Sequence, residues 1–193
     1  MKKLSLYIFL VLMFCNVGFA ELISFSNIKI GDKITEYFNS QQISKYYVFD
    51  EEKTPKGEVL YGKDKKYSYI EIFSSDKIFK EEYDFIHLYY ENDTKKIVSI
   101  AGGDNHSSLD DCLKKRNNLV SEYQQKNRIT SLFNKQENNN NLPDGTKDYN
   151  IGFYGKTIFA FHCYVLPNGE VSHHVALYET NYNDYVFKKW NEE

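Results

Sequence analysis

A long amphipathic helix with strand-like segments on both sides constrains the fold more than any other feature of the chain. Apolar residues recur at spacings of three and four up to about residue 126, and lysine, asparagine and glutamate occupy the positions between them. Two alternative capping pairs, Ser107 with Asp110 and Ser108 with Asp111, mark where this helix begins. The helix therefore divides the chain into two halves.

Both halves contain short runs rich in tyrosine, phenylalanine and isoleucine, with turn residues between them. Such spacing predicts antiparallel β-meanders. We therefore predict an α+β fold in which the long central helix and a C-terminal helix pack on one face of the sheet. The predicted strands are 45–49, 58–61, 67–73, 83–90, 97–101, 149–153, 157–166 and 170–180, and the predicted short helices are 32–38 and 183–190.

The segment 135–147 is rich in asparagine and ends near Pro143, Asp144 and Gly145. This composition predicts a polar loop. We interpret the loop as an insertion within one domain that spans residues 21–193.

The first twenty residues have the three-part order of a cleavable secretory signal. Two lysines follow the initiating methionine, and about ten mostly apolar residues come next. Gly18 and Ala20 place small side chains at the −3 and −1 positions of a cut before Glu21. A membrane-spanning helix needs about 20 apolar residues, roughly twice this run. We expect cleavage near Ala20 and a periplasmic or secreted protein, with an uncleaved anchor or a lipoprotein cysteine at Cys15 as alternatives.

Net charge argues against two classes of partner. Loss of residues 1–20 removes two lysines and leaves 22 basic against 27 acidic residues, a net charge near −5. No basic stripe remains, so we expect no nucleic acid and no anionic membrane as a partner. No later segment is long and apolar enough to span a bilayer, and we expect no stable membrane span in the mature form.

Two cysteines remain after the predicted cut. Cys112 lies on the apolar side of the predicted long helix, and Cys163 lies inside a predicted strand. An exported chain with one pair of cysteines most simply forms a disulfide, which here would join the helix to the sheet. Closing a loop of about 50 residues stabilises a fold by ~4 kcal/mol in the chain-entropy description. Two free buried thiols, or a reactive thiol or metal site, are the alternatives.

The hairpin around Asn168 and Gly169 decides which histidines are neighbours. If these two residues form the whole loop, Tyr164 lies opposite His173, and His162 shares their face. The two histidines are then diagonal neighbours with Cα atoms about 7–8 Å apart, close enough to bridge a metal. A zinc site needs three or four ligands. Cross-strand packing is the simpler interpretation, so we predict no metal and no cofactor and keep these two histidines as the only metal candidates.

The same register places Cys163 opposite His174, on the face that would meet the long helix. A cysteine–histidine nucleophile pair with an acid such as Asp110 can be drawn there. It requires a free thiol in an exported protein and has no local catalytic signature around it. We therefore predict no catalytic residue.

Several short motifs carry a family resemblance. The motifs are Ile-x-Ile-Gly-Asp at 28–32, Gly-Gly at 102–103, Asp-Cys-Leu-Lys-Lys-Arg at 111–116 and the cysteine-bearing strand. Through them the chain resembles a group of small exported proteins of AT-rich bacteria that have no assigned activity, and the likeness covers most of the mature chain. It is more distantly similar to small lipoproteins of outer-membrane assembly and to β-lactamase-inhibitor-like modules, which are binding modules.

Three classes of function remain open. The first is a non-enzymatic binding module for a protein or envelope component, with a contact surface around Tyr69, Tyr89 and Tyr164 on the side of the sheet away from the helices. The second is a small-ligand carrier with an aromatic lining. The third is an exported hydrolase that uses histidines of the C-terminal hairpin at 162, 173 or 174. Without a named catalytic motif, the residues favour the binding module.

Overall fold

The chain is described by a computed structural model. The predicted signal peptide and the predicted strand 58–61 lie outside the described residues. No described helix is long and apolar enough to cross a membrane. The described residues are 28–46, 66–73, 83–127, 134–142, 144–155 and 157–192.

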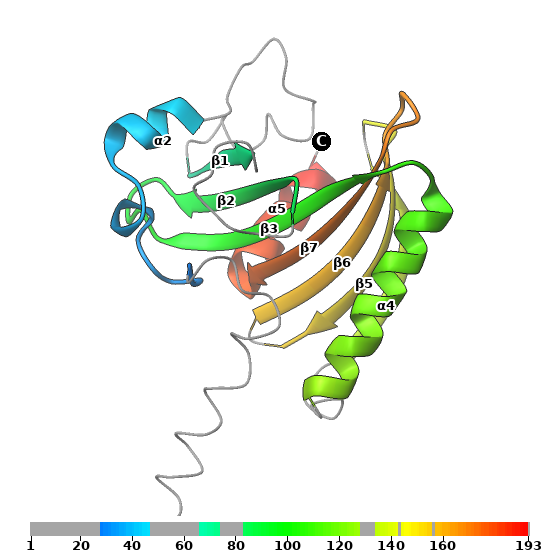
Figure 1. Ribbon diagram of the computed structural model, residues 1–193. Coiled ribbons are helices and arrows are strands. Elements are labelled where there is room, and N and C mark those ends of the chain that lie inside the picture. The colour runs from blue at the N-terminus through cyan, green and yellow to red at the C-terminus, as the bar shows by residue number, and fades with distance from the viewer. Residues whose placement is uncertain are drawn as a thin grey trace, which may run out of the picture.

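Seven antiparallel strands form one curved sheet, which confirms the predicted α+β class (Figure 1). The strand order across the sheet is β1-β2-β3-β7-β6-β5-β4. The elements are η1 (Ile34–Glu36), α2 (Ser40–Tyr46), β1 (Tyr67–Phe73), β2 (Phe85–Glu91), β3 (Ile97–His106), α4 (Leu109–Asn127), β4 (Asn134–Asn141), β5 (Lys147–Tyr154), β6 (Thr157–Val165), β7 (Val171–Glu179) and α5 (Thr180–Glu192).

The sheet consists of two meanders that meet at its centre. Strands β1 to β3 pair with their sequence neighbours, and so do β4 to β7. Strand β3 then pairs antiparallel with β7, which joins the two meanders into one seven-stranded sheet. Helix α4 carries the chain from β3 to β4 at the far edge. The long helix is thus the connection that permits the two meanders to share one sheet.

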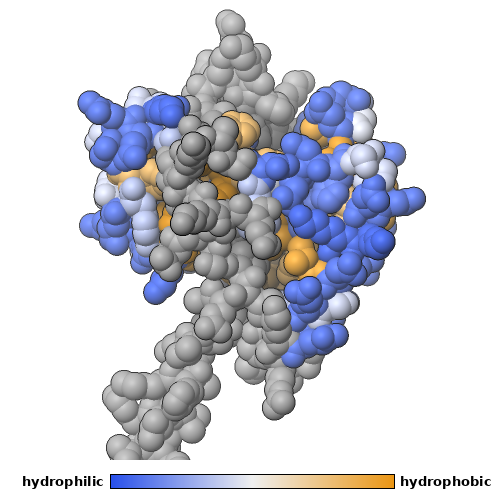
Figure 2. Space-filling view, in the orientation of Figure 1, coloured by the Kyte–Doolittle hydropathy of each residue, from blue (hydrophilic) through white to orange (hydrophobic). Residues whose placement is uncertain are grey.

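Helix α4 covers the second meander with the apolar side that its spacing predicts. Val120 and Tyr123 pack against Phe159, Phe161 and Val175 in one buried cluster. The outward side of the helix is mainly hydrophilic (Figure 2). The free energy of this contact comes from burying large apolar side chains, at about 25 cal/mol per Å² of apolar surface.

The N-terminal segment covers the first meander on the same side of the sheet. Ile34 and Phe38 are almost fully buried and pack against the inward side chains of β1 to β3, among them Ile70 and Leu88. Residues 45 and 46, predicted to begin a strand, instead end α2. We call this side of the sheet, which carries the α4 cluster and the N-terminal cluster, the helix face.

Helix α5 lies on the opposite side of the sheet, so the prediction that both helices share one face is wrong. Leu177 packs with the α4 cluster, whereas its neighbour Tyr178 packs with the cluster that contains Tyr182 of α5. Successive side chains of a strand point to opposite faces. The ring of Tyr182 contacts Tyr67 with centroids 5.0 Å apart. Figure 1 shows α5 behind the sheet and α4 in front of it.

Most of the predicted polar loop 135–147 is instead an edge strand. Strand β4 pairs with β5 along Asn134–Asn141, and all but one of its residues are exposed. Backbone hydrogen bonds to β5 hold β4 in place, so the strand does not need an apolar side. Polar side chains on an edge strand also discourage pairing with another chain. This segment is therefore part of the sheet.

Candidate functional site

The β6–β7 hairpin closes through a three-residue loop, and this length sets the register of all its side chains. The amide of Gly169 donates to the carbonyl of Leu166 at 2.9 Å, and the amide of Leu166 donates to the carbonyl of Glu170 at 2.9 Å. Gly169 has φ +88°, the left-handed conformation that a turn of this kind requires at its last position. Pro167, Asn168 and Gly169 thus form the loop, and the predicted two-residue loop is wrong.

This difference of one residue gives both histidines of β7 other cross-strand partners than the predicted ones. His162 is opposite His174, and Cys163 is opposite His173. Tyr164 is opposite Ser172, not opposite a histidine. His162 and His173 therefore point to opposite faces, so this pair of metal candidates cannot share an ion.

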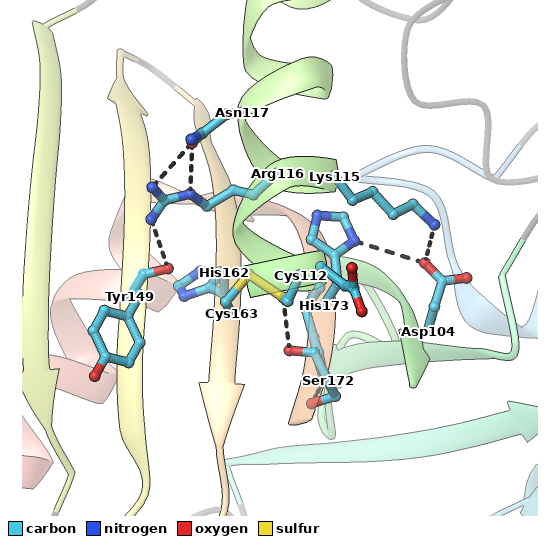
Figure 3. Close-up of a disulfide and its surroundings, with 12 residues drawn as sticks. Asp104, Cys112, Lys115, Arg116, Asn117, Tyr149, His162, Cys163, Ser172 and His173 are labelled. Atoms are coloured by element: carbon cyan, nitrogen blue, oxygen red, sulfur yellow. Dashed lines mark hydrogen bonds and ion pairs between the residues drawn. A yellow bond between two sulfur atoms is a disulfide. The ribbon is translucent and has the colours of Figure 1, made fainter. Parts of the chain in front are cut away.

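The helix face holds the predicted disulfide. Cys112 of α4 and Cys163 of β6 are bonded, with Cα atoms 5.9 Å apart and both side chains fully buried (Figure 3). The bond ties α4 to the sheet, as the sequence indicated. It also removes Cys163 as a nucleophile, and His174 lies on the other face. The cysteine–histidine pair that the two-residue register suggested is therefore wrong.

A buried arginine on α4 makes a second link between helix and sheet. Arg116 Nη1 donates to the carbonyl of Tyr149 at 3.1 Å, and Nη2 lies 3.1 Å from Glu137 Oε1 on β4. Its Nε and Nη2 also donate to Asn117 Oδ1 at 3.1 and 3.0 Å. The guanidinium thus contacts the neighbouring strands β5 and β4 through charge-assisted hydrogen bonds.

Near the start of α4 the helix face carries a polar cluster. Asp104 Oδ2 lies 2.6 Å from Lys115 Nζ and 3.6 Å from His173 Nδ1 (Figure 3). The ring centroid of His106 lies 6.1 Å from that of His173. Strand β3 extends to residue 106, whereas the sequence predicted that it ends at 101, and this extension brings Asp104 and His106 into the sheet.

Burial and neighbouring charges together lower the pKa values of both His173 and Asp104. Burial lowers the pKa of His173 from 6.5, and the opposing attraction of Asp104 is weaker. Burial raises the pKa of Asp104, but attraction to His173 and Lys115 outweighs burial and leaves that pKa lowered from 3.8. At neutral pH the imidazole is therefore neutral and the carboxylate is charged.

The three tyrosines of the predicted contact surface lie on the other side of the sheet. Tyr69 and Tyr89 are cross-strand partners whose rings stack at 5.1 Å. Tyr164 stacks on His162 at 5.1 Å and meets the edge of His174 at 4.8 Å. We call this side, with its tyrosines at 69, 89 and 164 and its histidines at 87, 162 and 174, the tyrosine face. Helix α5 packs on it too, so it does not lie away from the helices.

Rings connect the two ends of the tyrosine face across the centre of the sheet. The ring of His174 lies 5.0 Å from Phe85 and 5.9 Å from His87, and His87 lies 5.8 Å from Tyr69. Phe85 lies over its cross-strand partner Gly103, where an added Cβ would be 2.3 Å from the ring. The absence of a side chain on Gly103 thus permits the Phe85 ring to lie over this residue, where it meets the ring of His174 in a T-shaped contact.

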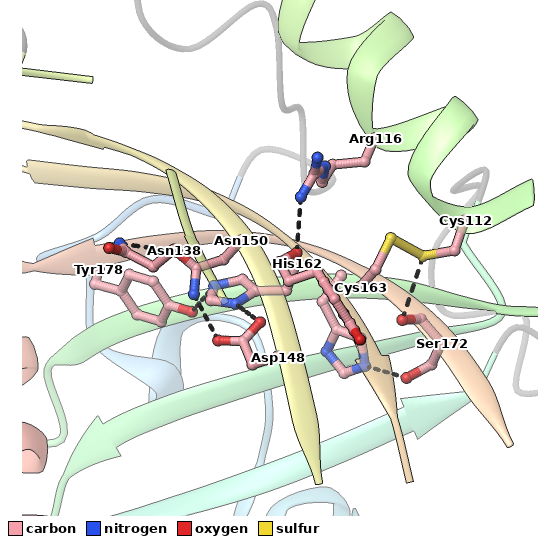
Figure 4. A network of polar contacts seen from close by, with 11 residues as sticks. Cys112, Arg116, Asn138, Asp148, Asn150, His162, Cys163, Ser172 and Tyr178 are labelled. Atoms are coloured by element: carbon pink, nitrogen blue, oxygen red, sulfur yellow. Dashed lines mark hydrogen bonds and ion pairs between the residues drawn. A yellow bond between two sulfur atoms is a disulfide. The ribbon is translucent and has the colours of Figure 1, made fainter. Parts of the chain in front are cut away.

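One histidine of the tyrosine face is held on both ring nitrogens. His162 Nδ1 lies 2.9 Å from Asp148 Oδ1, and the hydroxyl of Tyr178 lies 3.1 Å from Nε2 (Figure 4). Asn150 Nδ2 donates to the other oxygen of Asp148 at 2.7 Å. A charged Asp148 accepts a hydrogen bond, which assigns the ring proton to Nδ1 and makes Nε2 the acceptor from Tyr178.

The other histidines of the tyrosine face also have polar neighbours. His87 Nε2 lies 2.9 Å from Glu71 Oε1, and His174 Nε2 lies 3.2 Å from Ser172 Oγ. Burial holds the pKa of His174 well below 6.5, and repulsion from His87 and His162 lowers it further. His174 is therefore a neutral hydrogen-bonding group at pH 7.

Several of these residues were missed as site residues in the sequence. The sequence patterns singled out neither His87 nor His106, and they gave the acids at 71, 104 and 148 no role. Alternation along the strands could have indicated the histidine–acid contacts, because Glu71 and His87 are direct cross-strand partners.

Comparison with family models, with curated proteins and with solved structures found no match to this chain. Function is therefore argued from the chemistry of the two faces.

Proposed function

We propose that the chain is exported, is cleaved near Ala20 and works as a non-enzymatic binding module for a protein or envelope component. The signal-like start and the disulfide both support export, since disulfides persist in oxidising compartments. The binding surface is the tyrosine face, with Tyr69, Tyr89 and Tyr164 as its aromatic groups.

The continuous series of ring contacts from Tyr69 on β1 to Tyr164 on β6 carries this proposal. Tyrosine is enriched at protein interfaces because it combines a large apolar ring with a polar end. Rings that already contact one another lose little conformational freedom when a partner binds. Rings held in this way on a rigid sheet are better suited to binding a partner than to forming only an apolar core.

The polar groups of this face indicate what kind of group it accepts. The side chains of His87 and Glu71 are 14% and 25% exposed, and those of His162 and Asp148 are 11% and 7% exposed. Groups this sheltered are reached by a projecting group and not by a flat surface. Two carboxylates and the neutral ring of His174 favour a partner that brings hydrogen-bond donors or a positive charge.

Two other functions use the same face. Its sheltered polar groups also suit a small ligand, so a carrier is the second candidate. A hydrolase is the third, and the closest approach to one is the chain Asp148–His162–Tyr178. The alternative cysteine–histidine pair is excluded, because Cys163 is bonded to Cys112 on the helix face.

Site-specific photo-crosslinking in the exported protein tests the binding proposal. A photoreactive phenylalanine at Tyr164 is expected to give a discrete adduct with a protein or an envelope component. The matched control is the same residue at Lys114, which is exposed on α4 of the helix face. Adducts from both positions, or from Lys114 alone, would contradict the proposal. A small molecule released from the purified protein in native mass spectrometry would favour the carrier.

Intact mass of the exported protein tests export separately. We expect the mass of residues 21–193, lighter by two hydrogens, with no alkylation of Cys112 or Cys163 until reduction. Alkylation of both thiols without reduction, or a mass that retains residues 1–20, would show that the proposed compartment is wrong.

A further inference from the structure

Three potential metal ligands converge where the end of β3 meets the start of β7. Asp104 and His106 alternate on β3 and point to the same face, and His173 is the cross-strand partner of Asp104. One ligand atom from each of the three lies within 4.8 Å of the other two. Two neighbouring strands of one sheet thus hold all three groups on a rigid backbone.

The histidines of this cluster lack the hydrogen bonds that buried polar groups normally make. His173 is 0% exposed, and neither of its ring nitrogens has a hydrogen-bond partner within the described parts of the chain. The same is true of His106 Nε2, which is also buried. A buried polar atom without a partner costs about 1–3 kcal/mol. A bound cation would satisfy one nitrogen of each ring, because a neutral imidazole offers a lone pair.

We propose that Asp104, His106 and His173 bind a divalent transition-metal ion of the zinc class. Two imidazoles and one carboxylate suit zinc, cobalt and related ions, and they leave a fourth position for water. Zinc bonds of about 2.0–2.1 Å place tetrahedral ligand atoms about 3.3 Å apart, so ligand atoms up to 4.8 Å apart approach one another by up to about 1.5 Å on binding. This site lies on the helix face and is independent of the binding role of the tyrosine face.

Lys115 is the group that a metal must displace. Its Nζ lies 2.6 Å from Asp104 Oδ2, so its ammonium neutralises the carboxylate when no ion is bound. Its side chain is 38% exposed and flexible, and it can turn into solvent when a cation arrives. His106 is partly exposed at the end of β3, which provides access from the same side. Metal binding therefore replaces the ammonium of Lys115 with the metal ion as the positive charge beside Asp104.

Metal titration of the tag-free mature chain tests the proposal, with Zn²⁺ measured by calorimetry and Co²⁺ by its visible absorption. The wild-type chain is expected to bind one equivalent and to give the spectrum of a Co²⁺ ion with nitrogen and oxygen ligands. Lys115→Met removes the competing ammonium and is expected to tighten binding by roughly fivefold. Lys114→Met makes the same charge change on the exposed side of α4 and is expected to alter affinity by less than about twofold.

Replacing a metal-ligating side chain is expected to have the opposite effect on metal affinity. His106→Gln is expected to weaken binding by at least about tenfold, since even groups that only orient a ligand matter that much. Circular dichroism checks that the variant is folded, and the gain from Lys115→Met cannot come from misfolding. Equal affinity in the Lys115→Met and Lys114→Met variants would overturn the proposal. So would a Co²⁺ spectrum that survives His106→Gln and disappears with His87→Gln, because the ion would then be on the tyrosine face.

Discussion

The two faces of the sheet are built from the same strands but have different surroundings. His173 and His174 are adjacent in β7, and yet His173 lies on the helix face beside Asp104 while His174 lies among aromatic rings. The helix face is covered in part by α4, which the bond between Cys112 and Cys163 ties to β6. The tyrosine face keeps partly exposed ion pairs and stacked rings. The position of a histidine in the strand alternation therefore decides which face it lies on and which side chains it contacts.

Removal of the disulfide is expected to have the largest effect, because it weakens the helix face alone. Replacing both Cys112 and Cys163 by alanine is expected to lower the free energy of unfolding by ~4 kcal/mol, since the unfolded chain regains the freedom of a 51-residue loop. Guanidinium unfolding measures the change. A loss below about 1 kcal/mol would mean that α4 is held by packing alone.

Loss of the buried guanidinium should have the next largest effect. Arg116→Met keeps the aliphatic part of the side chain but leaves the carbonyl of Tyr149 without its donor. We expect a loss of about 1–3 kcal/mol in unfolding free energy. Lys114→Met is the control on the same helix and is expected to change stability by less than about 0.5 kcal/mol. Equal effects from the two variants would contradict the role given to Arg116.

Acid should destabilise the fold partly through His174. Its pKa is lowered in the folded chain, so the unfolded chain binds more protons once the pH falls below about 6.5. Stability is therefore complete above that pH and falls as the pH drops towards the folded-state pKa, by at most about 1.4 kcal/mol per pH unit for this one group.

His174→Gln removes that proton uptake and should flatten the pH dependence of unfolding between pH 6.5 and 5. Denaturant melts at several pH values measure the slope. His87→Gln is the comparison, because it also removes one imidazole from the tyrosine face but leaves His174 in place. A slope that is unchanged in His174→Gln would show that other groups cause the acid sensitivity.

The smallest effect on stability is expected on the tyrosine face itself. Tyr164→Leu removes the ring contacts with His162 and His174 but keeps an apolar side chain, so we expect a loss of about 1 kcal/mol. Capture of a partner by a photoreactive residue at Tyr89 should nevertheless fall sharply in this variant. A large loss of stability with normal capture would reverse the roles assigned to the two faces.

Local patterns in the sequence predicted most of the secondary structure. The capping pair of Ser108 and Asp111 is the one that forms, with the Asp111 amide donating to Ser108 Oγ at 3.2 Å. The bond between Cys112 and Cys163 was also predicted correctly, because these are the two cysteines that remain after the predicted cut. Capping and periodicity depend on neighbours in the sequence, and cysteine content depends on composition, so these signals can be found without a structure.

Features that depend on long-range pairing were predicted wrongly. Strand β4 has no apolar side to reveal it, since its hydrogen bonds to β5 are made by the backbone. The register of the β6–β7 hairpin depended on whether Pro167 joins the loop, and one residue of error moved His173 to the other face. The apolar residues of α5 showed that it packs, but not against which side of the sheet.

By itself, the sequence determined that the chain is α+β and that Cys112 would bond to Cys163. The first follows from the periods of helices and strands, which are local properties of the backbone, and the second follows from the count of cysteines. Only the tertiary structure decided which histidine meets which acid, as in the contacts of Asp104 with His173 and of Asp148 with His162. Those partners are far apart in the chain, and turn length and sheet register bring them together.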